Sequence, residues 1–418
     1  GKTSLADVIS GRAAHVAGEI TRGPTLTGQG IAYVCFEQAK ALCERDRKLD
    51  DSEFRADASD PGTRVRDLIL QGRAPDTDFE SWTQRLGMAH ILERGIRFIS
   101  TGEMRKTLLA SAILNRPGLL ILIDFPDFNL HLAAHARKLG IRVLYFISPQ
   151  IWAWRPGRVR KIKRLVDHMA VILPFEERFY HEHGVPVTYV GHPLLDGEMV
   201  FPDAAAHKSA PDGPAVVSLL PGSRHREVEK HLPLLLGAAE RLHQRHGQVA
   251  FLVSCAENID RAMVSRQVEA LCKRWSHLSM AVTGEDVRTL FARSTLSIAV
   301  SGTVTLQAAL CGTPTIIIYR ISPMSYRLGK RLIRVKHIGL ANLIAGRTIM
   351  PELIQEEAGP EKIAAAADQL LKSPARLSKM RADLLAVKQL LGSGGASRRV
   401  AEIAMDLLDE GDDSEAPC

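Results

Sequence analysis

Two short glycine-containing turns of this 418-residue chain have the residue types that bind a diphosphate. Each turn follows an apolar run typical of a buried strand and precedes a helical stretch, where backbone N–H groups favour anions. A guanidinium in the first turn adds a charge-assisted contact. The residues are Gly222, Ser223 and Arg224 in the first turn, and Ser301, Gly302 and Thr303 in the second. Two anion sites in one domain suit a nucleotide diphosphate leaving group without a metal ion or other cofactor; an ordinary strand–helix turn is the alternative for either alone.

Two carboxylates beside another apolar run are candidates for acid–base chemistry. Asp124 ends the run at 119–123 and is the candidate general base, with Asp127 as the alternative. A sugar hydroxyl is a weak nucleophile until a carboxylate accepts its proton in the transition state. In-line attack opposite a departing diphosphate would then invert the anomeric carbon. The plainer alternatives are that Asp124 only caps a strand end and that Arg224 only pairs with an acid at a helix start.

The elements that must position these residues alternate regularly along the chain. Apolar strand-like runs and amphipathic helical stretches follow one another through 119–193, and a second series begins at 215–220. Such alternation is typical of parallel α/β sheets, which bind ligands beyond the carboxyl ends of their strands. The sequence therefore predicts an α/β fold with two Rossmann-like domains that face a cleft, the arrangement of GT-B glycosyltransferases. A final helix is expected to return to the first domain.

Composition and charge narrow the class of ligand. A net charge of +7 and a pI near 9.1 suit phosphorylated substrates, anionic lipid or nucleic acid. Nucleic acid is the weakest of the three, because no RNP-like aromatics, zinc-finger pattern or long basic arm is present. The apolar runs are far shorter than the roughly 18 residues that span a bilayer. Six scattered cysteines and the lack of a secretory leader predict a cytoplasmic protein.

Seven segments between residues 123 and 347 resemble successive blocks of the lipid-A-disaccharide synthases. They are IDFPDFNL (123–130), SPQIWAWRPGRVRKI (148–162), ILPFEERFY (172–180), VGHPLLD (190–196), LLPGSRHREV (219–228), SGTVTLQAALCGTP (301–314) and ANLIAGR (341–347). The resemblance implies an inverting, metal-independent hexosyltransferase of lipid A biosynthesis. It would condense UDP-2,3-diacylglucosamine with 2,3-diacylglucosamine 1-phosphate to lipid A disaccharide 1-phosphate and UDP.

The resemblance also implies roles for individual residues. It favours Asp124 as the base, Arg224 as a phosphate contact and Asn342 as a donor contact. Gln307 stands where GT-B enzymes often use Glu to hold the ribose hydroxyls; an amide keeps hydrogen bonding but loses the charge. Two rival functions are considered: a chimeric chain that binds UDP without turnover, and another UDP-sugar enzyme such as an epimerase. The WAWRPGR and ANLIAGR blocks disfavour the second rival.

The residues before 119 resemble a different family. GKTSL (1–5), the stretch 31–54 and FISTGEMRKTLLASAILNRPGLLIL (98–122) resemble parts of ABC-transporter ATPases. An ATPase needs Asp-Glu after the LLIL strand. Here Ile123 and Asp124 follow instead, so ATP hydrolysis is not expected. Because LLIL fits both families, a fusion at about 117–123 is predicted, which leaves the N-terminal domain atypical or incomplete.

These observations divide the chain into four expected parts. They are an ATPase-like fragment (1–118), the remainder of an acceptor-side domain (119–200), a UDP-sugar-binding domain (201–372), and C-terminal helices with an acidic tail (373–418). Asp76 and Asp78 are expected to lie in a solvated loop and not to bind metal.

The expected partners follow from the acylated substrates. The basic amphipathic stretch 319–340 could rest on an anionic membrane, or be an ordinary solvated helix. We expect a peripheral protein on the cytoplasmic face of the inner membrane of a Gram-negative bacterium, and a homodimer is possible. Trp152 and Trp154 are predicted to share one face of an extended stretch that lines the acyl-sugar site or packs beneath a loop. His192 could contact substrate or serve as a hydrogen-bonded interdomain histidine.

Overall fold

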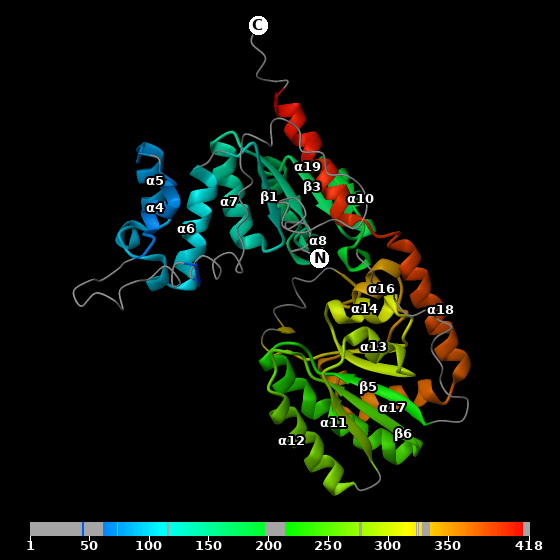
Figure 1. Ribbon diagram of the computed structural model, residues 1–418. Helices are drawn as coiled ribbons and strands as arrows, with labels where there is room; N and C mark the ends of the chain where they lie inside the picture. The colour runs from blue at the N-terminus through cyan, green and yellow to red at the C-terminus, as the bar shows by residue number, and fades with distance from the viewer. Residues whose placement is uncertain are drawn as a thin grey trace, which may run out of the picture.

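The computed structural model describes residues 44–45, 62–72, 74–114, 117–196, 214–275, 278–322, 324, 326–327 and 335–412. Within them the chain forms two α/β bodies, each built on a wholly parallel sheet (Figure 1). This confirms the predicted α/β class with two Rossmann-like domains. The segment GKTSL, nearly all of 31–54 and residues 323, 325 and 328–334 of the basic stretch lie outside the described residues.

The first sheet has four strands that pair in chain order. They are β1 (Leu119–Ile123), β2 (Arg142–Phe146), β3 (His168–Val171) and β4 (Val187–Tyr189). The helical segments between them are α7 (Pro126–Lys138), α8 (Ile151–Trp154), η4 (Pro156–Arg158), α9 (Val159–Leu165) and α10 (Pro174–Glu182). Alternate residues of a strand point to opposite faces. Val143 and Tyr145 accordingly pack against the core beside α7 and α9, whereas Leu144 and Phe146 pack on the opposite face.

The second sheet has six strands in the order β10-β9-β8-β5-β6-β7. Their bounds are β5 (Ala215–Leu220), β6 (Val249–Ser254), β7 (Ser279–Thr283), β8 (Leu296–Val300), β9 (Thr315–Tyr319) and β10 (Glu352–Ile354). The chain builds outward from β5 to β7, then returns to the other side of β5 and builds outward from β8 to β10. The junction of β5 and β8 is therefore the point where the strand order reverses, and such points bind ligands in open α/β sheets.

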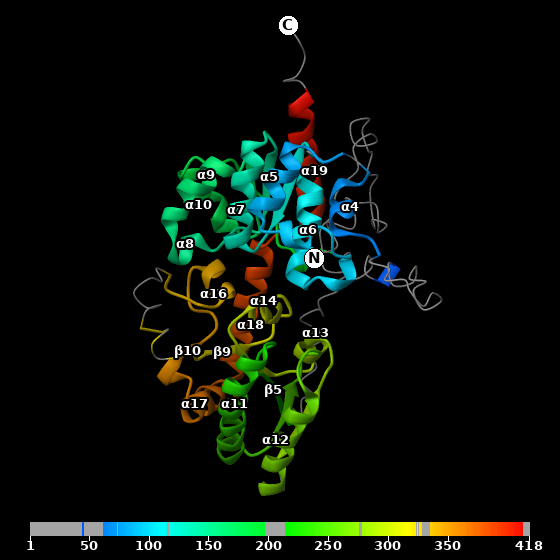
Figure 2. The same cartoon turned by 90° about the vertical axis from the view of Figure 1, so that its left-hand side faces the viewer.

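Helices cover both faces of this second sheet. They are α11 (His225–His246), α12 (Arg261–Arg274), α13 (Val287–Ala292), α14 (Thr303–Leu310), α16 (Leu340–Ala345) and α17 (Pro360–Leu371). The central strand β8 is buried along its whole length, as its continuous apolar run predicts for a parallel strand with two covered faces. In both views α8 of the first body lies on the side that faces α16 of the second (Figures 1 and 2).

The segment before β1 is helical. It contains α4 (Val65–Leu70), α5 (Thr77–Arg85), η2 (Ala89–Ile91), η3 (Ile96–Phe98) and α6 (Thr101–Leu114). Ser100 and Glu103, within the ATPase-like segment 98–122, form a reciprocal capping box at the start of α6. Asp76 was expected in a loop, but its carboxylate accepts a hydrogen bond of 2.7 Å from the Phe79 amide and caps α5. Trp82 and Leu109 belong to the same buried cluster as β1 and α7, so packing continues across residue 118.

The chain ends in two long helices, α18 (Pro374–Leu390) and α19 (Ala396–Asp412), which link the two bodies. Helix α18 packs on α14 and α16, whereas α19 returns to the first sheet, as predicted. There Val400 and Ala404 pack against Leu144 and Phe146. Helix α19 continues through residues 406–412, where Leu407 still packs against apolar neighbours on the sheet. No helix in the described part of the chain is long and apolar enough to cross a bilayer.

Asp196 holds the start of α19. Its carboxylate accepts hydrogen bonds of 2.7–2.8 Å from the amides of Gly395, Ala396 and Ser397 and from the Ser397 hydroxyl. The amides at a helix start have no partner within the helix, and a carboxylate there also favours the helix dipole. Arg399 adds a bond of 2.8 Å to the Val190 carbonyl. These contacts tie the C-terminal helix to the first domain.

Replacing Asp196 with alanine is expected to lower the free energy of unfolding by about 2 kcal/mol, since it removes a cap from a buried junction. Chemical denaturation followed by circular dichroism measures the change. Glu402→Ala is the matched control on the same helix: its carboxylate makes an exposed ion pair with Arg398, worth less than about 0.5 kcal/mol. Equal losses in the two variants would contradict the assignment of Asp196 as the cap.

Candidate functional site

The two glycine turns lie side by side at the point where the second sheet reverses its strand order. Leu220 at the end of β5 is the register partner of Ala299, one residue before the end of β8. The turn at 221–224 and the turn at 301–303 therefore emerge at the same edge of the sheet, from adjacent strands. Each leads into a helix, α11 and α14 respectively. The structure thus brings together the two anion sites that the sequence suggests.

The first turn is arranged around an anion that belongs to the chain itself. One carboxylate oxygen of Glu227 accepts from the amides of Ser223 and Arg224, at 3.2 and 3.3 Å. The other oxygen accepts from the Arg224 guanidinium at 3.0 Å. Gly222 has a φ of +113°, and a Cβ there would lie 2.7 Å from the Glu227 carboxylate. The helix start therefore has its donors oriented toward a negative group.

Arg224 is well placed to exchange this internal partner for a ligand. Its side chain is 83% exposed, and its ion pair with Glu227 spans three residues on the surface of α11. Exposed pairs of this kind contribute roughly 0–1 kcal/mol, so a diphosphate can compete for the guanidinium. This pairing is the plainer alternative considered from the sequence, an acid at the helix start, although Glu227 itself was not identified. The signal for it was available, because an acid three residues after a helix cap is the mark of a capping box.

The second turn is open. Gly302 and Thr303 are exposed, and a Cβ placed on Gly302 would meet nothing within 4 Å. The Ser301 hydroxyl donates a long bond of 3.4 Å to the Ile338 carbonyl. Gln307 lies one turn further along α14 and is half-buried. Unlike the first turn, this helix start carries no carboxylate cap on its described residues, which leaves room for an oxyanion at its amides.

Asn342 is fully buried, and both ends of its amide are used within the protein. Its oxygen accepts from the amides of Ile349 and Met350, and its nitrogen donates to the Met350 carbonyl and to Glu352. Glu352 in turn accepts from the amides of Ile338 and Gly339 at 3.0 Å each. The geometry favours a positioning role for Asn342, which fixes the segment beside Ser301, over the direct donor contact that the resemblance implies.

Asp124 in the first domain has an unusual backbone. Asp124 and Phe125 have φ values of +54° and +46°, in the left-handed region that side chains other than glycine rarely adopt. The Asp124 carbonyl is held by the Tyr145 hydroxyl at 2.7 Å and by the Asn129 amide at 2.5 Å. Strain of this kind is kept where surrounding contacts enforce it, commonly at functional sites. The half-buried Asp124 therefore has the stronger geometric case as the base.

Asp127 differs from Asp124 in its surroundings. Its side chain is 77% exposed, and its carboxylate accepts a hydrogen bond of 2.7 Å from the Arg158 guanidinium. The main-chain carbonyl of Asp127 also contacts the His131 ring nitrogen within the first turns of α7. Asp127 is thus already paired with a cation, and this pair links Arg158 to the start of α7.

Trp152 and Trp154 do not share a face. The sequence predicted an extended stretch, but residues 151–154 form the helical turn α8, which turns the two rings in different directions. The Trp152 indole donates to Glu176 at 3.0 Å and packs edge-on against Phe175. Trp154 is exposed, and the Arg155 guanidinium lies over its ring, 4.2 Å from the ring centroid. The prediction failed because Pro149 and Pro156 frame a short turn and not a strand.

His192 lies at the junction of the two domains. It is buried, and its Nδ1 accepts a hydrogen bond of 3.1 Å from the Leu194 amide. Burial lowers the pKa of His192 to about 4, so its ring is neutral at physiological pH. These contacts agree with the expected hydrogen-bonded interdomain histidine and not with a substrate ligand.

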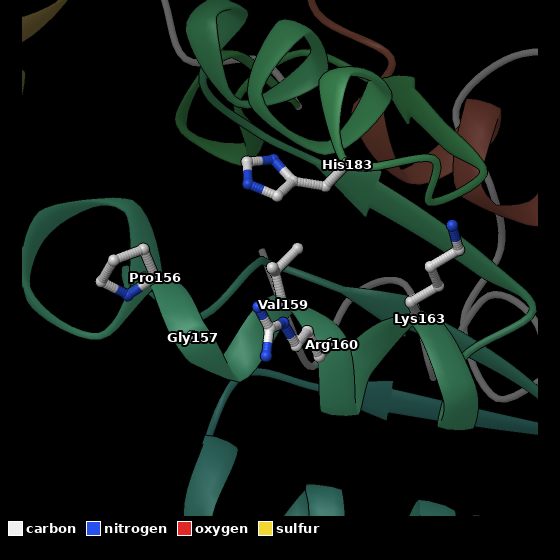
Figure 3. Close-up of a pocket in the computed structure, with 6 residues that line it drawn as sticks. All are labelled: Pro156, Gly157, Val159, Arg160, Lys163 and His183. Carbon is white, nitrogen blue, oxygen red and sulfur yellow. The ribbon is translucent and has the colours of Figure 1, made fainter.

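A separate hollow of about 600 Å³ lies between α9 and the end of α10 (Figure 3). Its lining residues are Pro156, Gly157, Val159, Arg160, Lys163 and His183. Val159 points across the hollow toward His183 (Figure 3). None of the residues predicted for the site lines this hollow. No group of three His, Cys, Asp or Glu side chains with metal-binding geometry occurs among the described residues.

Comparison with known proteins identifies the family of this chain. A model of the lipid-A-disaccharide synthetase family matches residues 81–404. This chain belongs to the lipid-A-disaccharide synthase family. A lipid-A-disaccharide synthase of Geobacter sulfurreducens is 46% identical over 305 residues, which cover 72% of this chain and 78% of the relative. One from Anaeromyxobacter dehalogenans is 40% identical over 352 residues, or 83% of this chain and 88% of the relative.

The front of the chain also matches a second family. A model of ABC transporters matches residues 1–124, in agreement with the ATPase-like fragment inferred from the sequence. The two matches overlap at 81–124. The synthase match thus begins in α5, well before the fusion point predicted at 117–123, and the packing of Trp82 on the first sheet agrees with that earlier start.

Two solved structures match most of this chain at low sequence identity. The UDP co-structure of Staphylococcus aureus MnaA has a TM-score of 0.49 and 12% identity, and it covers 82% of this chain and 87% of that one. The UDP-GlcNAc 2-epimerase of Neisseria meningitidis, bound to UDP-GlcNAc, has a TM-score of 0.46 and 12% identity, with 81% and 84% covered.

Glu176 is expected to make the stability of this chain depend on pH. Burial raises its pKa from the ordinary 4.5 to about 7, although Trp152 and two backbone amides donate to it. The folded chain thus binds this proton more tightly than the unfolded chain. Its contribution to stability is complete below pH 4.5 and is lost as the pH rises through about 7.

Glu176→Gln is therefore expected to flatten the decline in unfolding free energy across this window, measured by chemical denaturation at a series of pH values. Trp152→Phe keeps the carboxyl and is expected to keep the decline. A Glu176→Gln profile parallel to that of the unmodified chain would show that another group titrates.

Proposed function

We propose that the chain transfers a diacylated glucosamine from UDP-2,3-diacylglucosamine to 2,3-diacylglucosamine 1-phosphate, which gives lipid A disaccharide 1-phosphate and UDP. Membership of the lipid-A-disaccharide synthase family supports the reaction. The observation that carries the proposal is the pairing of the two glycine turns at the β5–β8 junction. One turn provides an exposed guanidinium, and the other provides an open helix start.

The donor diphosphate is assigned to these two turns. Its oxygens accept hydrogen bonds from the amides at Ser223 and Arg224 and at the start of α14, and Arg224 turns from Glu227 to the phosphates. A diphosphate leaving group gains negative charge as the glycosidic bond breaks, so donors fixed in advance stabilise the transition state more than the ground state. Gln307 holds the ribose hydroxyls. Asn342 and Glu352 act indirectly by fixing the segment next to Ser301.

Asp124 is assigned as the general base. It accepts the proton of the attacking acceptor hydroxyl while the hydroxyl oxygen bonds to the anomeric carbon and the bond to the diphosphate oxygen breaks. UDP leaves with the bonding electron pair, and the anomeric carbon is inverted. Because Tyr145 and Asn129 fix the backbone carbonyl of Asp124, the carboxylate has little freedom to rearrange during the step.

The place of action follows from the substrates. Both carry acyl chains, and the chain has a net charge of +7, which favours anionic surfaces. We place the enzyme on the cytoplasmic face of the inner membrane as a peripheral protein. Sedimentation with vesicles that contain anionic phospholipid, reversed by salt, tests this placement; binding that is insensitive to salt would contradict its electrostatic basis.

The second candidate function is UDP binding without turnover. It is favoured by the ABC-transporter match at the front of the chain and by the four-strand extent of the described first sheet. Product formation from the two lipid substrates separates the candidates, whereas protection by UDP is common to both.

Asp124→Asn is expected to reduce kcat about 10²- to 10⁴-fold, since the amide cannot accept the proton. Thermal protection by UDP should be unchanged, because the two turns lie in the other domain. Asp127→Asn is the matched control and is expected to retain most of the turnover. The assay is UDP release under saturating substrates; a larger loss in the Asp127 variant would reverse the assignment of the base.

Arg224→Ala is expected to abolish most of the thermal stabilisation that UDP gives to the unmodified chain, because ligand binding to the folded state is what raises the unfolding temperature. Differential scanning fluorimetry with UDP and with uridine isolates the diphosphate contribution. Arg226→Ala, an exposed arginine two residues along α11, is the control and should keep the UDP shift. An equal response to UDP and uridine in the unmodified chain would argue against both turns as phosphate sites.

A further inference from the structure

Large aromatic side chains are exposed beside the proposed base. Phe125, Phe128 and Trp154 are 68%, 45% and 38% exposed, although side chains of this size usually pack inside. The rings of Phe125 and Phe128 lie 6.2 Å apart at the start of α7. Phe125 directly follows Asp124 in the chain. An apolar surface therefore begins at the residue that is proposed to activate the acceptor.

Two arginines connect these rings into one surface. Asp127 lies between the two phenylalanines in the sequence, and its carboxylate accepts a hydrogen bond of 2.7 Å from Arg158. The Arg158 guanidinium also lies 6.0 Å from the Trp154 ring centroid. Arg155 lies over the same ring at 4.2 Å. The acceptor patch, defined as Phe125, Phe128, Trp154, Arg155 and Arg158, thus joins the first turn of α7 to the segment after α8.

The two arginines differ in whether a carboxylate already neutralises their charge. Asp127 neutralises Arg158, whereas Arg155 forms no ion pair with any carboxylate of the described residues and is exposed. Stacking on an indole orients a guanidinium without using its N–H donors, which stay free for a planar contact with phosphate. The net positive charge of the patch therefore resides on Arg155.

We propose that the acceptor patch binds the acylated sugar phosphate acceptor, with Arg155 as the ligand of its phosphate and the phenylalanines as the surface for its acyl chains. This inference rests on the proposed transferase function and names the acceptor side of the same site. A molecule with a phosphate at one position and hydrocarbon at another matches a surface with one available guanidinium and adjoining exposed rings. Its sugar hydroxyl then lies near Asp124.

A cycle of variant and substrate tests the phosphate contact. Acceptor KM is measured at saturating donor for the unmodified chain and for Arg155→Ala, each with the phosphorylated acceptor and with the same diacylglucosamine lacking the phosphate. Arg155→Ala is expected to raise KM for the phosphorylated acceptor about 10- to 100-fold, as for loss of a hydrogen bond to a charged group, with kcat nearly unchanged. It should not change KM for the acceptor without phosphate.

Arg160→Ala is the matched control. Arg160 is an exposed cation on α9 that lines the separate hollow, and its loss should change acceptor KM less than about twofold if general attraction is unimportant. Arg155→Lys keeps the charge and loses the planar fork, so it is expected to recover only part of the affinity. Phe128→Ala should weaken the binding of acceptors with long acyl chains more than that of acceptors with short ones.

The same comparison of variants and acceptors can be made without turnover. Tryptophan fluorescence measures the equilibrium binding of the two acceptors in detergent. Equal effects of Arg155→Ala on both acceptors, or an equal effect of Arg160→Ala, would overturn the inference. Failure of the proposed function would give a different result, because the unmodified chain would then release no UDP. The binding measurements would still decide whether Arg155 contacts the phosphate. Unchanged UDP protection in each variant shows that the second domain is folded.

Discussion

The parallel pairing of the first sheet requires that both of its faces be covered, because parallel strands present apolar side chains on each side. One face is covered by α7 and α9, which follow the strands directly in the chain. Helix α19 packs on the other face, and it comes from the far end of the sequence. The cap on this helix by Asp196 and the contacts of Arg399 hold it in place. The two domains are thus connected by the same contact that completes the first core.

Carboxylates at helix starts recur throughout the molecule. Glu103, Asp196 and Glu227 each accept hydrogen bonds from amides that no helix can satisfy internally. At α19 and α6 the arrangement is structural. At α11 the helix start also carries an exposed arginine and a glycine turn, and it lies next to a second turn without such a cap. The proposed anion site is therefore distinguished by its neighbours at the sheet edge and not by the cap alone.

Much of this arrangement could be predicted from the sequence. The strands at 119–123, 215–220 and 296–300 were evident as apolar runs, and the turns after the last two were identified from glycine and serine. The strands β7 and β10 were not predicted, because they lie at the sheet edges and carry polar or partly exposed residues. Partners distant in sequence were also missed, such as Glu352 for Asn342 and Glu176 for Trp152. Hydrogen bonding across the fold leaves no periodic pattern in the sequence.

The return of α19 to the first sheet has a consequence for biosynthesis. A ribosome makes the strands β1 to β4 first, whereas the helix that lies on Leu144 and Phe146 is made only after the whole second sheet. Domains generally fold as they emerge. Here the first domain cannot complete its core until the second has been translated. Until then one face of its sheet is uncovered, and a nascent chain would need a chaperone at this stage.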